Sequence, residues 1–143
     1  MLLRRAFLVL ATLWLASIPL AAFAASRTSA PQPAYGFALA VYSLGRLICH
    51  QLPERSFHLW AASLPVCARC TGIYAGAAMT AIALSFTGVR ERNAKAVFVV
   101  ACLPTAATLI FEWTTGVMPA NWIRALAGVP LGAAVAWAIG MVN

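Results

Sequence analysis

Three long runs of apolar residues are the feature that most restricts how this chain can fold. They cover residues 71–89, 96–115 and 125–142, and the only charge within them is Glu112. A helix needs about 20 largely apolar residues to cross the hydrocarbon core of a bilayer. Each run has about this length, so the sequence predicts three transmembrane helices.

The composition agrees with a membrane location. The chain has 143 residues, of which 63% are hydrophobic and 9% are charged, and a soluble domain of this size cannot enclose so much apolar material. We therefore expect an all-α, polytopic integral membrane helical bundle in one domain, with the lipid bilayer as its partner. The net charge of +7 fits membrane orientation better than nucleic acid. A protein partner or a homo-oligomer is compatible with the sequence, which identifies neither.

The first 25 residues have the layout of a secretory signal peptide. Arg4 and Arg5 precede a long uncharged stretch, and small residues surround Phe23 near its end. The apolar stretch is slightly long for a cleaved signal, so an uncleaved signal anchor is an equal alternative. In both cases a Ser/Pro-rich linker over residues 26–33 follows on the outer side of the membrane.

The remaining residues, 34–143, form the membrane domain, and its topology depends on residues 34–49. This stretch is uncharged as far as Gly45 but contains Tyr35 and Tyr42, and we expect it to form an interfacial helix within residues 34–70. The short basic connection over residues 90–95 is typical of a cytoplasmic loop. The segment from Cys49 to Cys70 then lies on the outer side of the cell's inner membrane. In the opposing model residues 34–49 span the bilayer and this segment is cytoplasmic.

The segment from Cys49 to Cys70 carries the residues with the clearest chemistry. Cys67 and Cys70 are separated by two residues, and a turn of this length brings both sulfurs to one side for a metal ion or a disulfide. Cys49 and His50 lie seventeen or more residues upstream, which suits a Cys3His metal site, and His58 is the rival fourth ligand. Mixed thiolate and imidazole ligands favour zinc.

Two other interpretations of these cysteines remain open, and with them the question of whether the protein is an enzyme. Cys67 and Cys70 are a possible redox pair of a membrane thiol–disulfide oxidoreductase, with Cys49 as partner thiol, because Arg69 and a helix starting at Thr71 would lower a thiolate pKa. The plainer alternative is a disulfide, or reduced thiols, that only staple a loop. Cys102 lies in an apolar run, where we expect an inert buried thiol.

A second group of polar residues lies where lipid makes them costly. Glu112 is near the end of its span, and Arg124, which follows Asn121, is the expected partner of an ion pair across the short connection between them. Arg55 and Arg69 are expected to extend to lipid head groups rather than to bind an anion. If this group rather than the cysteines is the functional centre, the protein would be a small carrier or an accessory subunit.

Glycines spaced four residues apart predict where two of the helices meet. Gly72 and Gly76 lie on one face of their helix, and Gly128 and Gly132 lie on one face of another. Small residues at this spacing permit close contact between membrane helices.

The polar segment also resembles a known family. Its signature is Cys49-His50-Gln51, then residues 53–57, then residues 65–74 with Gly76, which together are similar to small prokaryotic membrane proteins catalogued as domain of unknown function 2085. The resemblance extends over about residues 44–142, and it includes Asn121, Arg124 and the later glycines. Glu112 stands where the family pattern has an aspartate. The resemblance implies a membrane location and an important Cys/His segment, but no activity.

Overall fold

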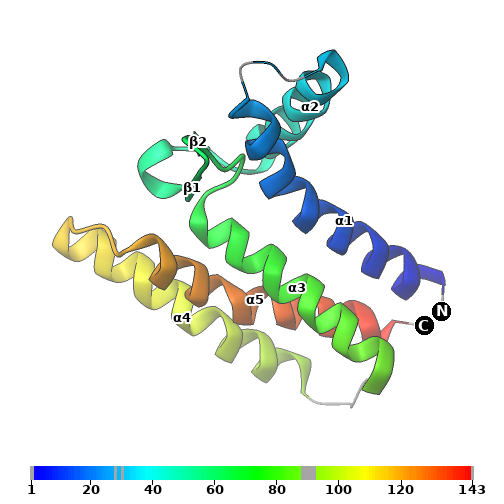
Figure 1. Ribbon diagram of the computed structural model, residues 1–143. Helices are drawn as coiled ribbons and strands as arrows, with labels where there is room; N and C mark the ends of the chain where they lie inside the picture. Colours follow the sequence, from blue (N-terminus) through cyan, green and yellow to red (C-terminus); the bar gives the residue numbers. More distant parts are fainter. Residues whose placement is uncertain (1, 28, 30, 88–92, 143) are drawn as a thin grey trace.

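The computed structural model describes residues 2–27, 29, 31–87 and 93–142, and α-helices make up most of it (Figure 1). The helices are α1 (Leu2–Ala25), α2 (Gln32–Ile48), η1 (Pro53–Arg55), α3 (Ala68–Thr87), α4 (Ala94–Thr115) and α5 (Asn121–Met141). Between η1 and α3, β1 (His58–Leu59) pairs antiparallel with β2 (Ala62–Ser63). The expected all-α membrane bundle is confirmed.

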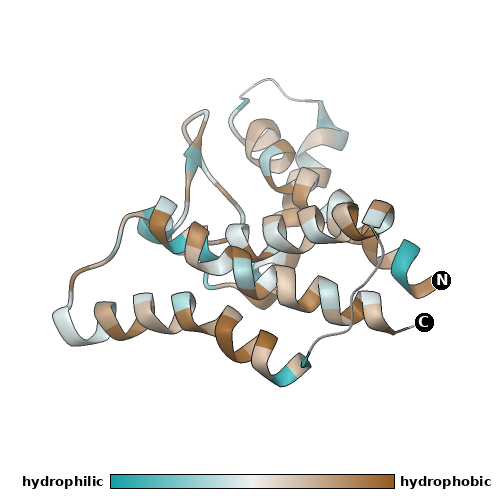
Figure 2. Ribbon diagram, turned by 90° about the horizontal axis from the view of Figure 1, so that it is seen from below, coloured by the Kyte–Doolittle hydropathy of each residue, from teal (hydrophilic) through white to brown (hydrophobic). Residues whose placement is uncertain are grey.

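Four helices in the described part of the chain are long and apolar enough to cross a membrane, namely α1, α3, α4 and α5. They correspond to the predicted N-terminal helix and the three predicted spans. Hydrophobic residues run along these helices, and hydrophilic residues gather near their ends and in the segment between α2 and α3 (Figure 2). Both α3 and α5 begin earlier than predicted, so Arg69 and Arg124 lie inside helices. Residues 90–92 of the predicted basic loop lie outside the described residues, and its last two residues, Ala94 and Lys95, belong to α4.

The helices α3 and α5 pack closely along their length through the predicted glycines (Figure 1). A Cβ atom added at Gly72 would overlap the carbonyl oxygen of Ala125, and one at Gly132 would overlap that of Ile73. Gly76 and Gly128 meet the opposite backbone in the same way. The expectation of close helix contact at these glycines is confirmed, and both helices contribute to it.

The helix α1 packs against α2 and against the segment that precedes α3. Ala21 and Ala24 form a buried cluster with Ala38 and Val41 of α2. These small residues, which give the sequence its signal-like end, therefore serve here as a helix contact. α2 begins at Gln32, within the predicted linker, and it is not among the candidate spans of the described chain.

A tight turn at Trp60 and Ala61 joins β1 to β2. Both residues have left-handed backbone angles, with φ of 52° and 66°, as the central residues of a type I′ hairpin turn require. This hairpin is not predicted from the sequence, because Asn-Gly and Asp-Gly, the usual residues of such turns, are absent from it. Trp60 at the turn packs edge to face on Phe23 near the end of α1, with ring centroids 5.2 Å apart.

We predict that Gly132→Ala destabilises the protein by about 1–3 kcal/mol, because the added methyl group forces the α3 and α5 backbones apart. Gly36→Ala in α2 is the matched control. No atom lies within 4 Å of the position its Cβ would occupy, so the change should be neutral or stabilise by up to about 1 kcal/mol. Thermal unfolding of both variants in detergent measures the difference. Equal stability of the two variants would contradict the packing role of Gly132.

Candidate functional site

The sulfur atoms of Cys49, Cys67 and Cys70 form a compact group, named here the thiol cluster, at one end of the bundle. All three lie within 4.8 Å of one another. Cys49 caps the C-terminal end of α2, Cys67 lies just before α3, and Cys70 is in the first turn of α3. The fold thus brings together the three cysteines that the sequence singled out.

Side-chain and backbone hydrogen bonds hold the end of α2 against the residues before α3. The Gln51 side-chain amide donates to the carbonyl oxygens of Tyr42 at 2.7 Å and of Pro65 at 2.6 Å. The backbone N–H of Cys67 donates to the Cys49 sulfur at 3.1 Å. Gln51 takes a left-handed φ of 50° to make these contacts, a conformation that a non-glycine residue adopts only when its surroundings enforce it.

The thiol of Cys67 ionises far more readily than an ordinary cysteine. Its pKa is lowered to about 5, chiefly by a hydrogen bond from the Cys70 side chain. Burial opposes this shift, while the backbone of Cys70, the Cys49 side chain and the positive charge of Arg124 support it. Cys67 is therefore a thiolate at neutral pH, which is the form that binds metal ions and attacks disulfides.

Apolar side chains cover the thiol cluster on the side of α1. Ile18 and Ala22 of α1 are buried in one cluster with Cys49. Trp14 of α1 packs edge to face on Tyr74 of α3, with ring centroids 5.9 Å apart. Water is thus excluded from this side, and electrostatic interactions at the sulfurs are correspondingly stronger.

The remaining sequence candidates for metal or thiol chemistry lie apart from the thiol cluster. Among the described residues, the group of potential ligands contains no histidine or carboxylate, and His50 and His58 are both exposed. Cys102 is exposed on the surface of α4, so the expectation of a buried thiol is wrong. Its side chain faces outward because the helix contacts of α4 are made by other faces.

Glu112 forms ion pairs with two arginines from distant parts of the chain. Its Oε1 atom lies 2.8 Å from Nη2 of Arg55, and its Oε2 atom lies 3.8 Å from Nη2 of Arg69. Arg69 also donates to the hydroxyl of Thr108 at 3.2 Å, one helical turn before Glu112. The spacing of Thr108 and Glu112 places both on one face of α4. This spacing is the sequence signal that the two residues share a partner.

The expected ion pair between Glu112 and Arg124 is wrong. Both ion pairs recorded for Glu112 in the described chain are with Arg55 and Arg69. Arg124 donates instead to Asn121 Oδ1 and Met118 Sδ, each at 3.5 Å. The closer partner of Glu112 is Arg55, which belongs to η1. The sequence does not predict this pair because η1 is far from α4 along the chain.

Asn121 connects this group to the segment that follows η1. Its Nδ2 atom donates to the carbonyl oxygen of Ser56 at 3.0 Å, and Ser56 is fully buried. The polar residues singled out from the sequence are therefore connected. Ion pairs join Arg55 and Arg69 to Glu112. Hydrogen bonds join Arg124 to Asn121, and Asn121 to Ser56, which follows Arg55 in the chain. We name Arg55, Arg69 and Arg124 with Glu112 the arginine cluster.

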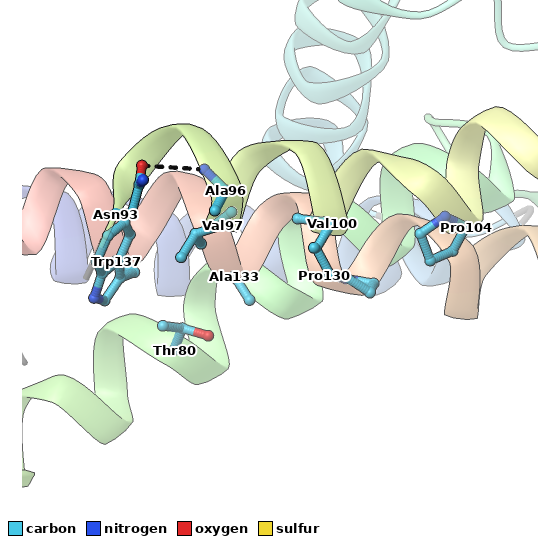
Figure 3. Close-up of a pocket in the computed structure, with 11 residues that line it drawn as sticks. Thr80, Asn93, Ala96, Val97, Val100, Pro104, Pro130, Ala133 and Trp137 are labelled. Carbon is cyan, nitrogen blue, oxygen red and sulfur yellow. Dashed lines mark hydrogen bonds between the residues drawn. The ribbon is translucent and has the colours of Figure 1, made fainter.

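A separate apolar groove of about 800 Å³ lies between α3, α4 and α5 (Figure 3). Pro104 and Pro130 line it at mid-helix, and Asn93 and Trp137 line it toward one end. Neither cysteines nor charged residues contribute to its lining. The groove is thus distinct from the thiol cluster and offers no group that would carry out chemistry.

Comparisons with known proteins give a family but no activity. The family model described as "Predicted membrane protein (DUF2085)" matches residues 49–138. An uncharacterized protein of Methanocaldococcus jannaschii is 50% identical over 38 residues, which are 27% of this chain and 24% of that protein. Another, of Methanothermobacter thermautotrophicus, is 59% identical over 32 residues, which are 22% of this chain and 29% of that protein. The matched segments thus cover under a third of either relative, and no solved structure matches.

We predict that Cys67 in the reduced, metal-free protein reacts with iodoacetamide almost as fast at pH 6 as at pH 8. Its pKa of about 5 keeps it ionised across this range, whereas an ordinary thiol loses reactivity about tenfold per pH unit below its pKa. Peptide mass spectrometry measures the rates, with free glutathione as internal reference. Cys70→Ala removes the main hydrogen bond, so it should restore a steep dependence on pH. A steep dependence in the unmodified protein would contradict the assignment.

Proposed function

The chain belongs to the DUF2085 family of predicted membrane proteins, and we propose that it binds a transition metal ion, preferably zinc, through Cys49, Cys67 and Cys70. The observation that carries this proposal is the approach of the three sulfurs to within 4.8 Å of one another. Tetrahedral coordination with Zn–S bonds of about 2.3 Å places sulfurs about 3.8 Å apart, so closure needs a movement of at most about 1 Å. The low pKa of Cys67 supplies one ligand already deprotonated at neutral pH.

A fourth ligand would complete a tetrahedral site. His50 is our preferred candidate because it follows Cys49 directly in irregular chain between α2 and η1, where the backbone is free of helical hydrogen bonding. His58, exposed on β1, is the rival. Either imidazole must turn toward the sulfurs, since both are exposed in the structure.

The same geometry supports thiol–disulfide exchange as a second candidate function. Cys67 as thiolate would attack a disulfide of a substrate, forming a mixed disulfide and releasing one substrate thiolate. Cys70, after losing its proton to the medium, would then attack the Cys67 sulfur, releasing the second thiolate and leaving a Cys67–Cys70 disulfide. The substrate disulfide is reduced and the protein dithiol is oxidised. The specific support is the lowered pKa of Cys67.

We place the thiol cluster on the outer side of the cell's inner membrane. The N-terminal ends of α1 and α4 lie away from the end of the bundle where α2 leads into α3 (Figure 1). Arg4 and Arg5 are in the first of these ends and Lys95 is in the second, as the positive-inside rule favours for a cytoplasmic face. At the opposite end, Trp113 and Trp122 are largely exposed, as expected of tryptophans at head-group level. α2, which is not among the candidate spans of the described chain, would lie along the outer interface.

We predict about one zinc ion per chain in protein purified in detergent under reducing conditions without chelator. Cys67→Ser and Cys70→Ser should each lose most of the metal, because each removes one of three ligands. Cys102→Ser is the matched control, since Cys102 is exposed on α4 outside the thiol cluster. Elemental analysis gives the metal content, and thiol counting on the same samples gives the redox state.

The possible results separate the two candidate functions. Metal in the unmodified protein and the Cys102 variant, with loss in the other two, supports the metal site. Absence of stoichiometric metal from the unmodified protein refutes it. Absence of metal together with a Cys67–Cys70 disulfide, and with mixed disulfides trapped by Cys70→Ser, supports the exchange reaction instead.

We predict that in spheroplasts a tag inserted at Ser29 is cut by added protease, whereas a tag at the C-terminus is protected. This result follows from the proposed topology, in which the thiol end of the bundle faces outward. The intact mass of the purified chain reports at the same time whether α1 is retained, as its buried contacts with α2 favour. Protection of the Ser29 tag together with cleavage at the C-terminus would reverse the orientation.

A further inference from the structure

The arginine cluster contains more buried positive charge than its own carboxylate neutralises. Arg124 is 1% exposed, Arg69 has 13% of its side chain exposed, and Arg55 has 40%. The one carboxylate that pairs with them in the described chain is Glu112, itself 9% exposed. Three guanidinium groups against one carboxylate leave a surplus of two positive charges. A surplus of buried charge is costly unless a counterion accompanies it.

Several polar atoms of the arginine cluster also lack partners. Among the described residues, the Nε atoms of Arg55, Arg69 and Arg124 are all buried without a hydrogen bond, and so is Oε2 of Glu112. In the part of the chain that the structure describes, Arg124 makes two hydrogen bonds of 3.5 Å, to an amide oxygen and to a thioether, and the first is long for an N–H···O bond. Buried donors without partners are rare in folded proteins, and a bound ligand or an ordered water is one way to satisfy them.

The three arginines reach this region from separate elements. Arg55 comes from η1, Arg69 from the first turn of α3 and Arg124 from the first turn of α5. Glu112 joins the first two, and Arg124 interacts electrostatically with both of them and with Glu112. The guanidinium groups of Arg55 and Arg69 are thus close enough to act on one small anion, and the charge of Arg124 acts on both groups.

We propose that the arginine cluster binds a tetrahedral oxyanion with phosphate chemistry. Guanidinium groups bind phosphate oxygens with paired, charge-assisted hydrogen bonds. A phosphate group carries one or two negative charges against this surplus, and its oxygens accept hydrogen bonds from more than one direction. A carboxylate offers two oxygens in one plane, whereas a tetrahedral phosphate offers oxygens in several directions to arginines from three separate elements. The phosphate is either a free anion or the head group of an anionic lipid, because the cluster lies at an end of the bundle.

The thiol cluster lies beside the arginine cluster and reduces its surplus of positive charge. It does not remove the surplus. The positive charge of Arg124 acts on Cys67, so a thiolate there balances one of the two charges. One positive charge remains, together with the three unpartnered Nε atoms. Phosphate binding therefore does not require the proposed metal, and Cys67→Ser should retain it.

The test uses full-length protein in a neutral detergent, titrated with inorganic phosphate, with chloride at equal ionic strength as reference. Phosphate should raise the unfolding temperature in a saturable manner. Arg55→Gln should weaken phosphate binding at least tenfold, and because Arg55 is partly exposed the variant should fold. Arg46→Gln on the exposed surface of α2 is the matched control and should bind as the unmodified protein does. In parallel, the protein is reconstituted in bilayers of phosphatidylcholine with and without phosphatidylglycerol. The readout is the phosphatidylglycerol that stays bound when the protein is purified again.

Each outcome decides the proposal. Saturable phosphate binding that Arg55→Gln weakens and Arg46→Gln preserves supports it with a free anion as ligand. Retention of phosphatidylglycerol through purification, lost in Arg55→Gln alone, supports it with a lipid head group as ligand. No difference between phosphate and chloride, together with equal lipid retention by both variants, overturns it. Loss of phosphate binding in Arg46→Gln to the same extent as in Arg55→Gln also overturns it, because the effect would then be one of general charge.

Discussion

The close contact between α3 and α5 is the constraint that brings Arg69 near Arg124 and sets the charge of Arg124 beside the thiol cluster. In lipid, apolar side chains gain nothing by leaving one hydrocarbon environment for another, so helices associate through tight packing of small residues. A Cβ at Gly128 would overlap the carbonyl oxygen of Arg69, which shows how near the first turn of α3 lies to α5. Arg69, Cys70 and Arg124 meet because these two backbones touch.

The two clusters also modify each other. Arg69 lies between the paired cysteines in the sequence, and the charge of Arg124 stabilises the Cys67 thiolate. An apolar cover from Ile18 and Ala22 limits solvent screening, so these interactions act over longer distances than they would in water. Binding of a metal ion at the sulfurs would therefore change the electrostatic field at the arginines, and an anion at the arginines would change the field at the sulfurs.

The sequence predicts the helices, and it predicts which residues form the clusters. It predicts less well which residues pair with each other inside a cluster. Long uncharged runs, the paired glycines and the spacing of Cys67 and Cys70 are local patterns, and their consequences follow from helix geometry alone. The partner of Glu112 depends on how η1 folds back over the bundle, which no periodicity encodes, and Arg55 consequently replaced the expected Arg124. The hairpin at Trp60 was missed because its left-handed turn uses residues that rarely form one. The exposed position of Cys102 depends on which face of α4 meets its neighbours.

The spread of each cluster along the chain implies an order of assembly during synthesis. The thiol cluster uses residues 49–70 and can close once α3 has entered the membrane. The arginine cluster draws on residues 55–124 and must wait for α4 and α5. Until Glu112 arrives with α4, Arg55 and Arg69 stand without their carboxylate, and lipid phosphates at the interface are the counterions within reach.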